Sequence, residues 1–133
     1  MGQSLKIVDE SSIAPEVFDR LQQATSDPVG IAELYRDYLA DARSALVELR
    51  NALQRKQADE FRSRAHYVKG SSLILGATVV AQCCATLEEM GRNSEFGGAE
   101  QLLDKTEAAL DRVEAELVRK LGSVLAPAKG SAA

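Results

Sequence analysis

The sequence predicts an all-α protein, an antiparallel four-helix bundle with a short additional helix at its N-terminus. Apolar residues recur at three- and four-residue steps through long stretches of the 133-residue chain, which is the periodicity of amphipathic helices. No segment alternates apolar and polar residues over a useful length, so no sheet is expected. Short connections separate the long stretches, and such connections favour antiparallel neighbours in one bundle.

The first two helices have recognisable starts. Residues 1–12 are expected to form an extended lead-in, after which Pro15 and Glu16 open a short helix, because proline and an acidic residue suit the first helical turn. Asp27 is expected to cap the second helix, which is long. The apolar face of that helix comprises Ile31, Leu34, Tyr35, Tyr38, Leu39, Ala42, Leu46, Leu49 and Leu53.

Three further helices follow a break near residues 55–57. The apolar stripe of the first comprises Ala58, Phe61, Ala65, Val68, Ser72 and Leu75, and Gly76 is expected to end it. The stripe of the next comprises Val80, Cys83, Cys84, Leu87 and Met90, with Gly91 expected as its C-cap. After a loop at 93–98, the last helix is marked by Leu103, Thr106, Leu110, Val113, Leu117 and Leu121. We therefore expect the bundle to span 13–121 and a disordered tail to span 122–133.

Composition argues against several classes of partner. The formal net charge of −4 disfavours nonspecific binding to nucleic acid, which requires many basic side chains facing phosphates. Only 5% of the residues are aromatic and tryptophan is absent, so base stacking is not expected either. No apolar run approaches the roughly 20 residues of a membrane helix, and the first residues lack an apolar signal-peptide core. We therefore expect a cytoplasmic monomer that binds neither nucleic acid nor membrane.

His66, the only histidine in the chain, stands out. It lies one residue past Ala65, about 100° around the helix, and so outside the apolar stripe. Lys69 and Gly70 follow at the three- and four-residue spacings that bring side chains together on one helix face. Glycine in mid-helix costs about 0.5–1 kcal/mol relative to alanine, so its presence suggests that close approach is required there.

Two more residues share the outward strip of His66, namely Arg62 and Leu73. Leu73 adds an apolar side chain to an otherwise polar strip. A lone histidine on a helix can equally be a surface residue with no task, and that interpretation remains open from the residues alone. The basic neighbour and the glycine favour instead a histidine that carries an anionic group and admits another protein.

A hairpin at Gly76 would bring a further side chain to His66. Positions equally far from the turn lie side by side in an antiparallel pair, so His66 faces the level of residues 86–88. Leu87 is directed inward in this arrangement, and Glu88 could reach an imidazole nitrogen and fix the tautomer. The alternative is that Glu88 and Glu89 are simply solvated.

The run His66-Tyr67-Val68-Lys69-Gly70-Ser71-Ser72, with Gly76 beyond it, resembles the signature of histidine-containing phosphotransfer (HPt) domains. The resemblance extends over roughly residues 13–121. The run 87–92 also resembles the matching helix of fungal and plant members, in which a polar residue at the place of Glu88 lies close to the active histidine. Fungal members usually have glutamine there.

The resemblance implies a four-helix bundle, a phosphorylatable His66 and response-regulator receiver domains as partners, with a hybrid histidine kinase as a further candidate partner. It also implies a phosphocarrier and not a kinase. The residues agree with the last point, because the chain contains neither GxxxxGK[ST] nor GxGxxG. The phosphoryl group of a two-component phosphorelay would therefore reach this chain from another protein.

The predicted chemistry is phosphoryl transfer between a receiver aspartyl phosphate and His66. Such transfer depends mostly on alignment and charge stabilisation, and Lys69 would offset charge on the transferring oxygens. Arg62, Gly70 and Leu73 are the candidate docking residues. No cofactor or metal is expected on this chain, and the divalent metal is expected on the receiver.

Two other functions are compatible with the residues. A noncatalytic bundle that binds or sequesters a receiver domain would differ in that His66 takes no phosphoryl group. A metal or redox module would use Cys83, Cys84 and His66, but one histidine and two adjacent cysteines are too few ligands for a closed zinc site. Adjacent cysteines are also poorly placed for a mutual disulfide, so two buried thiols are the simpler interpretation.

Overall fold

The computed structural model describes residues 12–25 and 27–122, which fold into helices without any strand in those two ranges. The helices are α2 (Pro15–Thr25), α3 (Pro28–Gln54), α4 (Ala58–Leu75), α5 (Thr78–Asn93) and α6 (Ala99–Leu121). The predicted all-α fold class is confirmed. The expected lead-in and tail lie outside the described residues, apart from Ser12 and Gly122.

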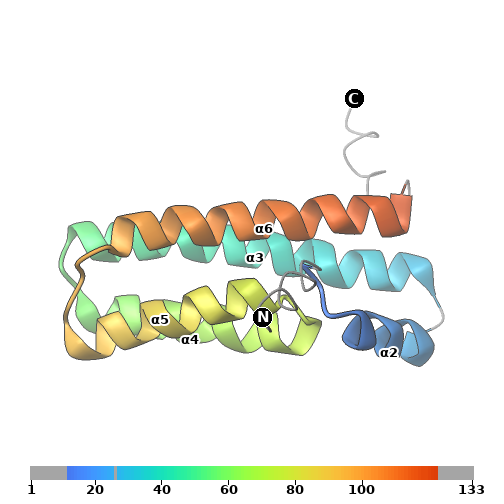
Figure 1. The fold of residues 1–133 in the computed structure, drawn as a ribbon, viewed down its shortest axis with the longest axis horizontal. Coiled ribbons are helices and arrows are strands. Elements are labelled where there is room, and N and C mark those ends of the chain that lie inside the picture. Colours follow the sequence, from blue (N-terminus) through green and yellow to red (C-terminus); the bar gives the residue numbers. More distant parts are fainter. Residues whose placement is uncertain (1–11, 26, 123–133) are drawn as a thin grey trace, which may run out of the picture.

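Four long helices form the bundle and α2 closes one of its ends (Figure 1). Each long helix packs against two neighbours, since α3 and α5 both contact α4 and α6. The helix α2 packs against α3 and α4. No helix in the described ranges is long and apolar enough to cross a membrane.

The core lies between the apolar stripes that the periodicity predicts. Its largest fully buried side chains include Ile31, Tyr35, Leu49, Phe61, Leu87, Leu103, Leu110 and Leu117. Six predicted stripe residues are less buried than expected: Leu34 is exposed, whereas Leu53, Ala58, Cys83, Met90 and Leu121 are only partly buried. These residues lie at the edges of their stripes, where a helical pattern cannot fix the boundary between core and solvent.

The predicted helix boundaries at Asp27 and Gly76 are confirmed. The Asp27 carboxylate accepts a hydrogen bond from the Val29 amide at 3.1 Å, which caps α3. Gly76 follows α4 with φ of 78°, a left-handed conformation that favours glycine. A Cβ at this position would also lie 2.9 Å from the Val17 Cβ, so α2 approaches the turn too closely for a side chain.

The prediction that Gly91 ends its helix is wrong. Gly91 is buried inside α5, and the helix continues to Asn93, followed by Ser94 as its C-cap with a φ of 52°. A Cβ at Gly91 would lie 2.9 Å from both the Cβ and the backbone nitrogen of Arg62. The glycine therefore allows α5 to approach α4 closely, one turn before His66.

Two tyrosine hydroxyls fix α3 against the second half of α4. The Tyr35 hydroxyl donates to the Leu75 carbonyl at 2.9 Å, and the Tyr38 hydroxyl lies 2.6 Å from the Ser72 hydroxyl in the buried interior. Buried polar groups require such partners, which explains how Ser72 occupies an apolar stripe. These bonds help to fix the rotation of α4, and with it the direction in which His66 points.

Candidate functional site

His66 lies on the outer side of α4, as its spacing from the apolar stripe predicts. Its side chain is 64% exposed. Ala65 and Val68, by contrast, are completely buried on the inner side of the same helix. The imidazole ring is therefore held on a rigid helix and remains accessible to another protein.

Glu88 of α5 is the residue that meets the imidazole. Its Oε2 lies 3.0 Å from Nδ1 of His66, and its Oε1 lies 2.8 Å from the ammonium of Lys69. The side chain is only 7% exposed, so the alternative of a solvated carboxylate is wrong for Glu88. It is right for Glu89, which is exposed. The hairpin geometry at Gly76 thus identifies the correct facing residue from the sequence.

The carboxylate of Glu88 is ionised at neutral pH. The ammonium of Lys69 is the largest influence and, together with the hydrogen bond to His66, holds the pKa of Glu88 below its usual value despite burial. An ionised carboxylate can only accept hydrogen bonds. In the neutral ring this contact favours the proton on Nδ1, which leaves the lone pair on Nε2.

Arg92 is a functional candidate that the sequence reasoning missed. It lies one turn after Glu88 on α5, and its Nη2 is 3.2 Å from Oε2 of Glu88. The other terminal nitrogen of its guanidinium pairs with Glu89. The spacing of four between Glu88 and Arg92 is the available sequence signal, but it gains meaning only once Glu88 is known to be buried beside His66.

Gly70 leaves open space next to His66. A Cβ built at this position would meet nothing within 4 Å. The glycine is therefore not required for packing between helices, in contrast to Gly76 and Gly91. Among the predicted docking residues, Gly70 is the one whose missing side chain most directly widens access to the ring.

Exposed apolar side chains lie beyond Gly70 on α4. Leu73 is 59% exposed, and Ile74, which the sequence reasoning did not single out, is 71% exposed. Arg62 lies on the opposite side of His66 along the helix and is partly buried at the crossing with Gly91. The strip around the imidazole thus has an apolar end and a basic end.

Comparison with known proteins identifies the family. Residues 33–116 match the Hpt domain family. The chain belongs to the Hpt domain family. It is 28% identical over 113 residues to multistep phosphorelay regulator 1 of Schizosaccharomyces pombe, a match that covers 84% of this chain and 38% of the regulator. The chain therefore spans well under half of that regulator's length.

A solved structure supports the same assignment. The histidine-containing phosphotransfer protein HptB of Pseudomonas aeruginosa PAO1 superposes with a TM-score of 0.78 and 27% identity, covering 85% of this chain and 96% of HptB. The predicted family and the predicted helical bundle fold are confirmed.

Lys69 of this Hpt domain already has an anionic partner. Its side chain is 30% exposed and its ammonium pairs with the buried Glu88 carboxylate. A phosphoryl group on Nε2 of His66 would therefore have to draw Lys69 away from an existing partner. The predicted role of this lysine in transfer includes an exchange of ion pairs that the sequence did not indicate.

In the described residues, the two cysteines of the Hpt domain do not form a metal-binding group with His66. Cys84 is fully buried, and burial raises the pKa of its thiol to about 12, so it carries almost no thiolate at neutral pH. Within 12–25 and 27–122, no three His, Cys, Asp or Glu side chains come together in a group that could hold a metal ion. Nothing in the described chain therefore favours the metal or redox hypothesis.

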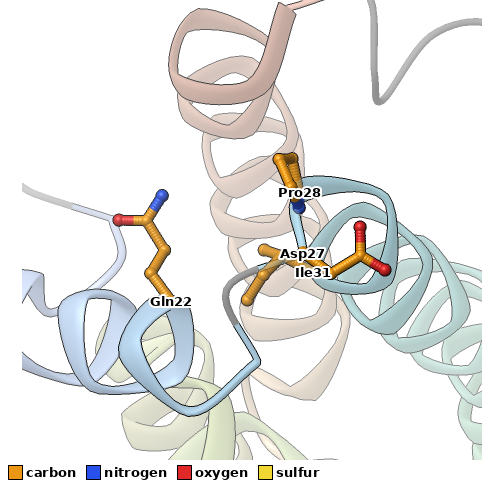
Figure 2. A pocket seen from close by; sticks show the side chains of 4 residues that line it. All are labelled: Gln22, Asp27, Pro28 and Ile31. Carbon is orange, nitrogen blue, oxygen red and sulfur yellow. The ribbon is translucent and has the colours of Figure 1, made fainter.

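An open hollow of about 230 Å³ lies away from this site, where α2 meets the start of α3 (Figure 2). It is lined by Gln22, Asp27, Pro28 and Ile31, none of which belongs to α4 or α5. Its one carboxylate, that of Asp27, already caps α3. The hollow therefore shares no lining residue with the groups around His66.

Proposed function

We propose that His66 is the phosphoryl-accepting residue of this Hpt domain and that Nε2 is the accepting atom. The chain contains one histidine, so histidine phosphotransfer by this chain has a single candidate residue. The observation that carries the proposal is the contact between Nδ1 and the ionised Glu88. Because a carboxylate beside Nδ1 favours the tautomer that carries the proton on Nδ1, Nε2 of the exposed ring is the proposed nucleophile.

The reaction is an exchange with the aspartyl phosphate of a response-regulator receiver domain. The bond between phosphorus and the aspartate oxygen breaks as the Nε2–P bond forms, and the electron pair returns to the receiver as a carboxylate. The Nδ1 proton stays on the ring, where Glu88 accepts its hydrogen bond. The reverse reaction uses the same groups, so His66 can both receive and donate the phosphoryl group.

The receiver supplies the divalent metal, and Lys69 supplies positive charge from the Hpt side. Charge on the transferring oxygens is the main quantity that such a site must stabilise. A hybrid histidine kinase is the proposed upstream source, acting through its own receiver domain. The Hpt domain is proposed to act in the cytoplasm as a monomer.

The receiver docks on the strip of α4 that surrounds His66. Leu73 and Ile74 offer apolar area at one end of the strip, and Arg62 offers positive charge at the other. Gly70 lets the receiver backbone approach the imidazole without meeting a side chain. An apolar surface with an adjacent acidic patch on the receiver would complement this strip.

The test is to mix the Hpt domain with receivers that carry a radiolabelled aspartyl phosphate. Label should move to the wild-type chain, survive base and be lost in acid, as expected of a P–N bond. A folded His66→Gln variant should bind the same receivers without taking label. Label on that variant would refute the proposal, whereas receiver binding without any transfer to wild type would favour the sequestering alternative.

A further inference from the structure

The Glu88 carboxylate has three cationic or proton-donating partners, and they divide unequally between its two oxygens. Oε2 is shared by Nδ1 of His66 and Nη2 of Arg92, at 3.0 and 3.2 Å. Oε1 lies 2.8 Å from the ammonium of Lys69, which is the largest influence lowering the pKa of Glu88. Lys69 is thus the partner of Oε1, whereas Arg92 and His66 are the partners of Oε2.

We propose that Arg92 is a positioning residue that keeps Glu88 neutralised while Lys69 turns towards the transferring phosphoryl group. The proposal rests on the function proposed above, in which Nε2 of His66 accepts that group. Lys69 is the partner suited to move, because its ammonium sits on a flexible four-carbon stem and lies on α4 beside His66. Arg92 is the partner suited to stay.

The burial of Glu88 explains why a permanent cation is needed. Its side chain is 7% exposed, and a buried carboxylate without a charged partner is strongly unfavourable. In a protein without Arg92, departure of Lys69 would leave the Glu88 carboxylate with only the imidazole N–H, next to an incoming group of the same sign. Without a second cation, Lys69 would remain on Glu88 and the phosphoryl oxygens would lose its charge.

Arg92 has the properties that this role requires. Its planar guanidinium carries several N–H donors in a fixed geometry and can hold two acceptors at once. One terminal nitrogen contacts Oε2 of Glu88 and the other pairs with Glu89. Since both carboxylates lie on α5 within a helical turn of Arg92, the guanidinium is fixed independently of Lys69 and of α4.

The experiment compares the wild type, Arg92→Gln and Arg92→Lys in transfer from a phosphorylated receiver, at increasing receiver concentration. We expect Arg92→Gln to lower the transfer rate at saturating receiver by about tenfold, which corresponds to the loss of one compensated charge contact. The receiver concentration for half-maximal rate should be unchanged, and Arg92→Lys should recover much of the rate. Arg112→Gln, on the exposed face of α6, is the matched control and should behave as wild type.

A second pair of variants ties the effect to Glu88. In a Glu88→Gln background the carboxylate charge is absent, so adding Arg92→Gln should leave the transfer rate of that background unchanged. An equal loss in both backgrounds would mean that Arg92 acts on the phosphoryl group or receiver directly, and would overturn the proposal. An effect confined to receiver affinity would also overturn it.

Folding and function are separated by two controls. If Arg92→Gln is too unstable to assay, the double variant with Glu88→Gln removes the uncompensated carboxylate and should restore folding. The comparison of Glu88→Gln with and without Arg92→Gln then decides the question, because the proposal requires equal rates. If the wild type takes no label from any receiver, the proposed function fails. If the wild type transfers normally and Arg92→Gln transfers at the same rate, only the proposal for Arg92 fails.

Discussion

Replacement of Gly70 by glutamine should separate stability from transfer. Gly70 lies in the interior of α4, and a Cβ there meets nothing within 4 Å, so the substitution introduces no clash. Glycine in an exposed helix interior costs about 0.5–1 kcal/mol relative to good helix formers. The free energy of unfolding should therefore rise by about that amount. For a bundle of this size, the midpoint of thermal unfolding should rise by roughly 2–6 °C.

Transfer should nevertheless fall sharply, because the new side chain stands one turn beyond His66 where the receiver approaches. The assay pairs thermal unfolding with receiver titration of the wild type, Gly70→Ala and Gly70→Gln. The alanine variant should gain similar stability with a smaller loss of affinity. Ala108→Gln places the same side chain on the exposed face of α6 and should leave affinity unchanged. A destabilised Gly70→Gln protein with normal receiver affinity would refute the access argument.

Three further substitutions test the surroundings of His66. Lys69→Ala should slow transfer and lower the free energy of unfolding by about 1–2 kcal/mol, because buried Glu88 loses a charged partner. The control variant Lys105→Ala, on the exposed face of α6, should change neither quantity. Equal stabilities of Lys69→Ala and the wild type in urea unfolding would contradict this prediction. Because the folded-state pKa of Glu88 is lowered from 4.5, its stabilising contribution is complete above that pH and is lost as the pH falls through the lowered value. Stability measured from pH 7 downward should therefore fall less steeply in Glu88→Gln, and parallel curves would count against the ion-pair network. Gly91→Ala should destabilise the bundle by about 1–3 kcal/mol, since its Cβ would lie 2.9 Å from Arg62, and an unchanged melting temperature would exclude the close crossing.

Much of the fold follows from local sequence signals. The periodicity of apolar residues predicts the long helices, and Asp27 and Gly76 mark boundaries through capping and left-handed conformation, both of which are local properties. Gly91 shows where such signals fail. A glycine near the end of an apolar stripe is compatible with a C-cap and with a close crossing of helices, and only the position of Arg62 on α4 distinguishes the two.

The site is predictable in outline but not in its electrostatics. The outward position of His66 follows from its offset from the apolar stripe, and symmetry about Gly76 brings Glu88 to its level. The burial of Glu88 does not follow from a local pattern, because it depends on how closely α5 approaches α4. The pairing of Lys69 with Glu88 and the second contact from Arg92 depend on that burial.

The exposed apolar side chains illustrate the same limit. Leu73 lies on the strip of His66 by helical spacing, but Ile74 could have faced either α3 or solvent. The structure leaves it 71% exposed. Adjacent exposed apolar residues on a surface are typical of contact with another protein. Their role in receiver docking stays a prediction, as does that of Arg62.

The central claim is that Nε2 of His66 carries the phosphoryl group while Nδ1 remains hydrogen-bonded to Glu88. Nitrogen and phosphorus NMR of the ¹⁵N-labelled Hpt domain, phosphorylated by a receiver, tests both halves in one sample. A phosphorus–nitrogen coupling to Nε2, together with a protonated Nδ1, is the predicted result. Coupling to Nδ1, or a phosphorylated chain without coupling to either His66 nitrogen, would contradict the account.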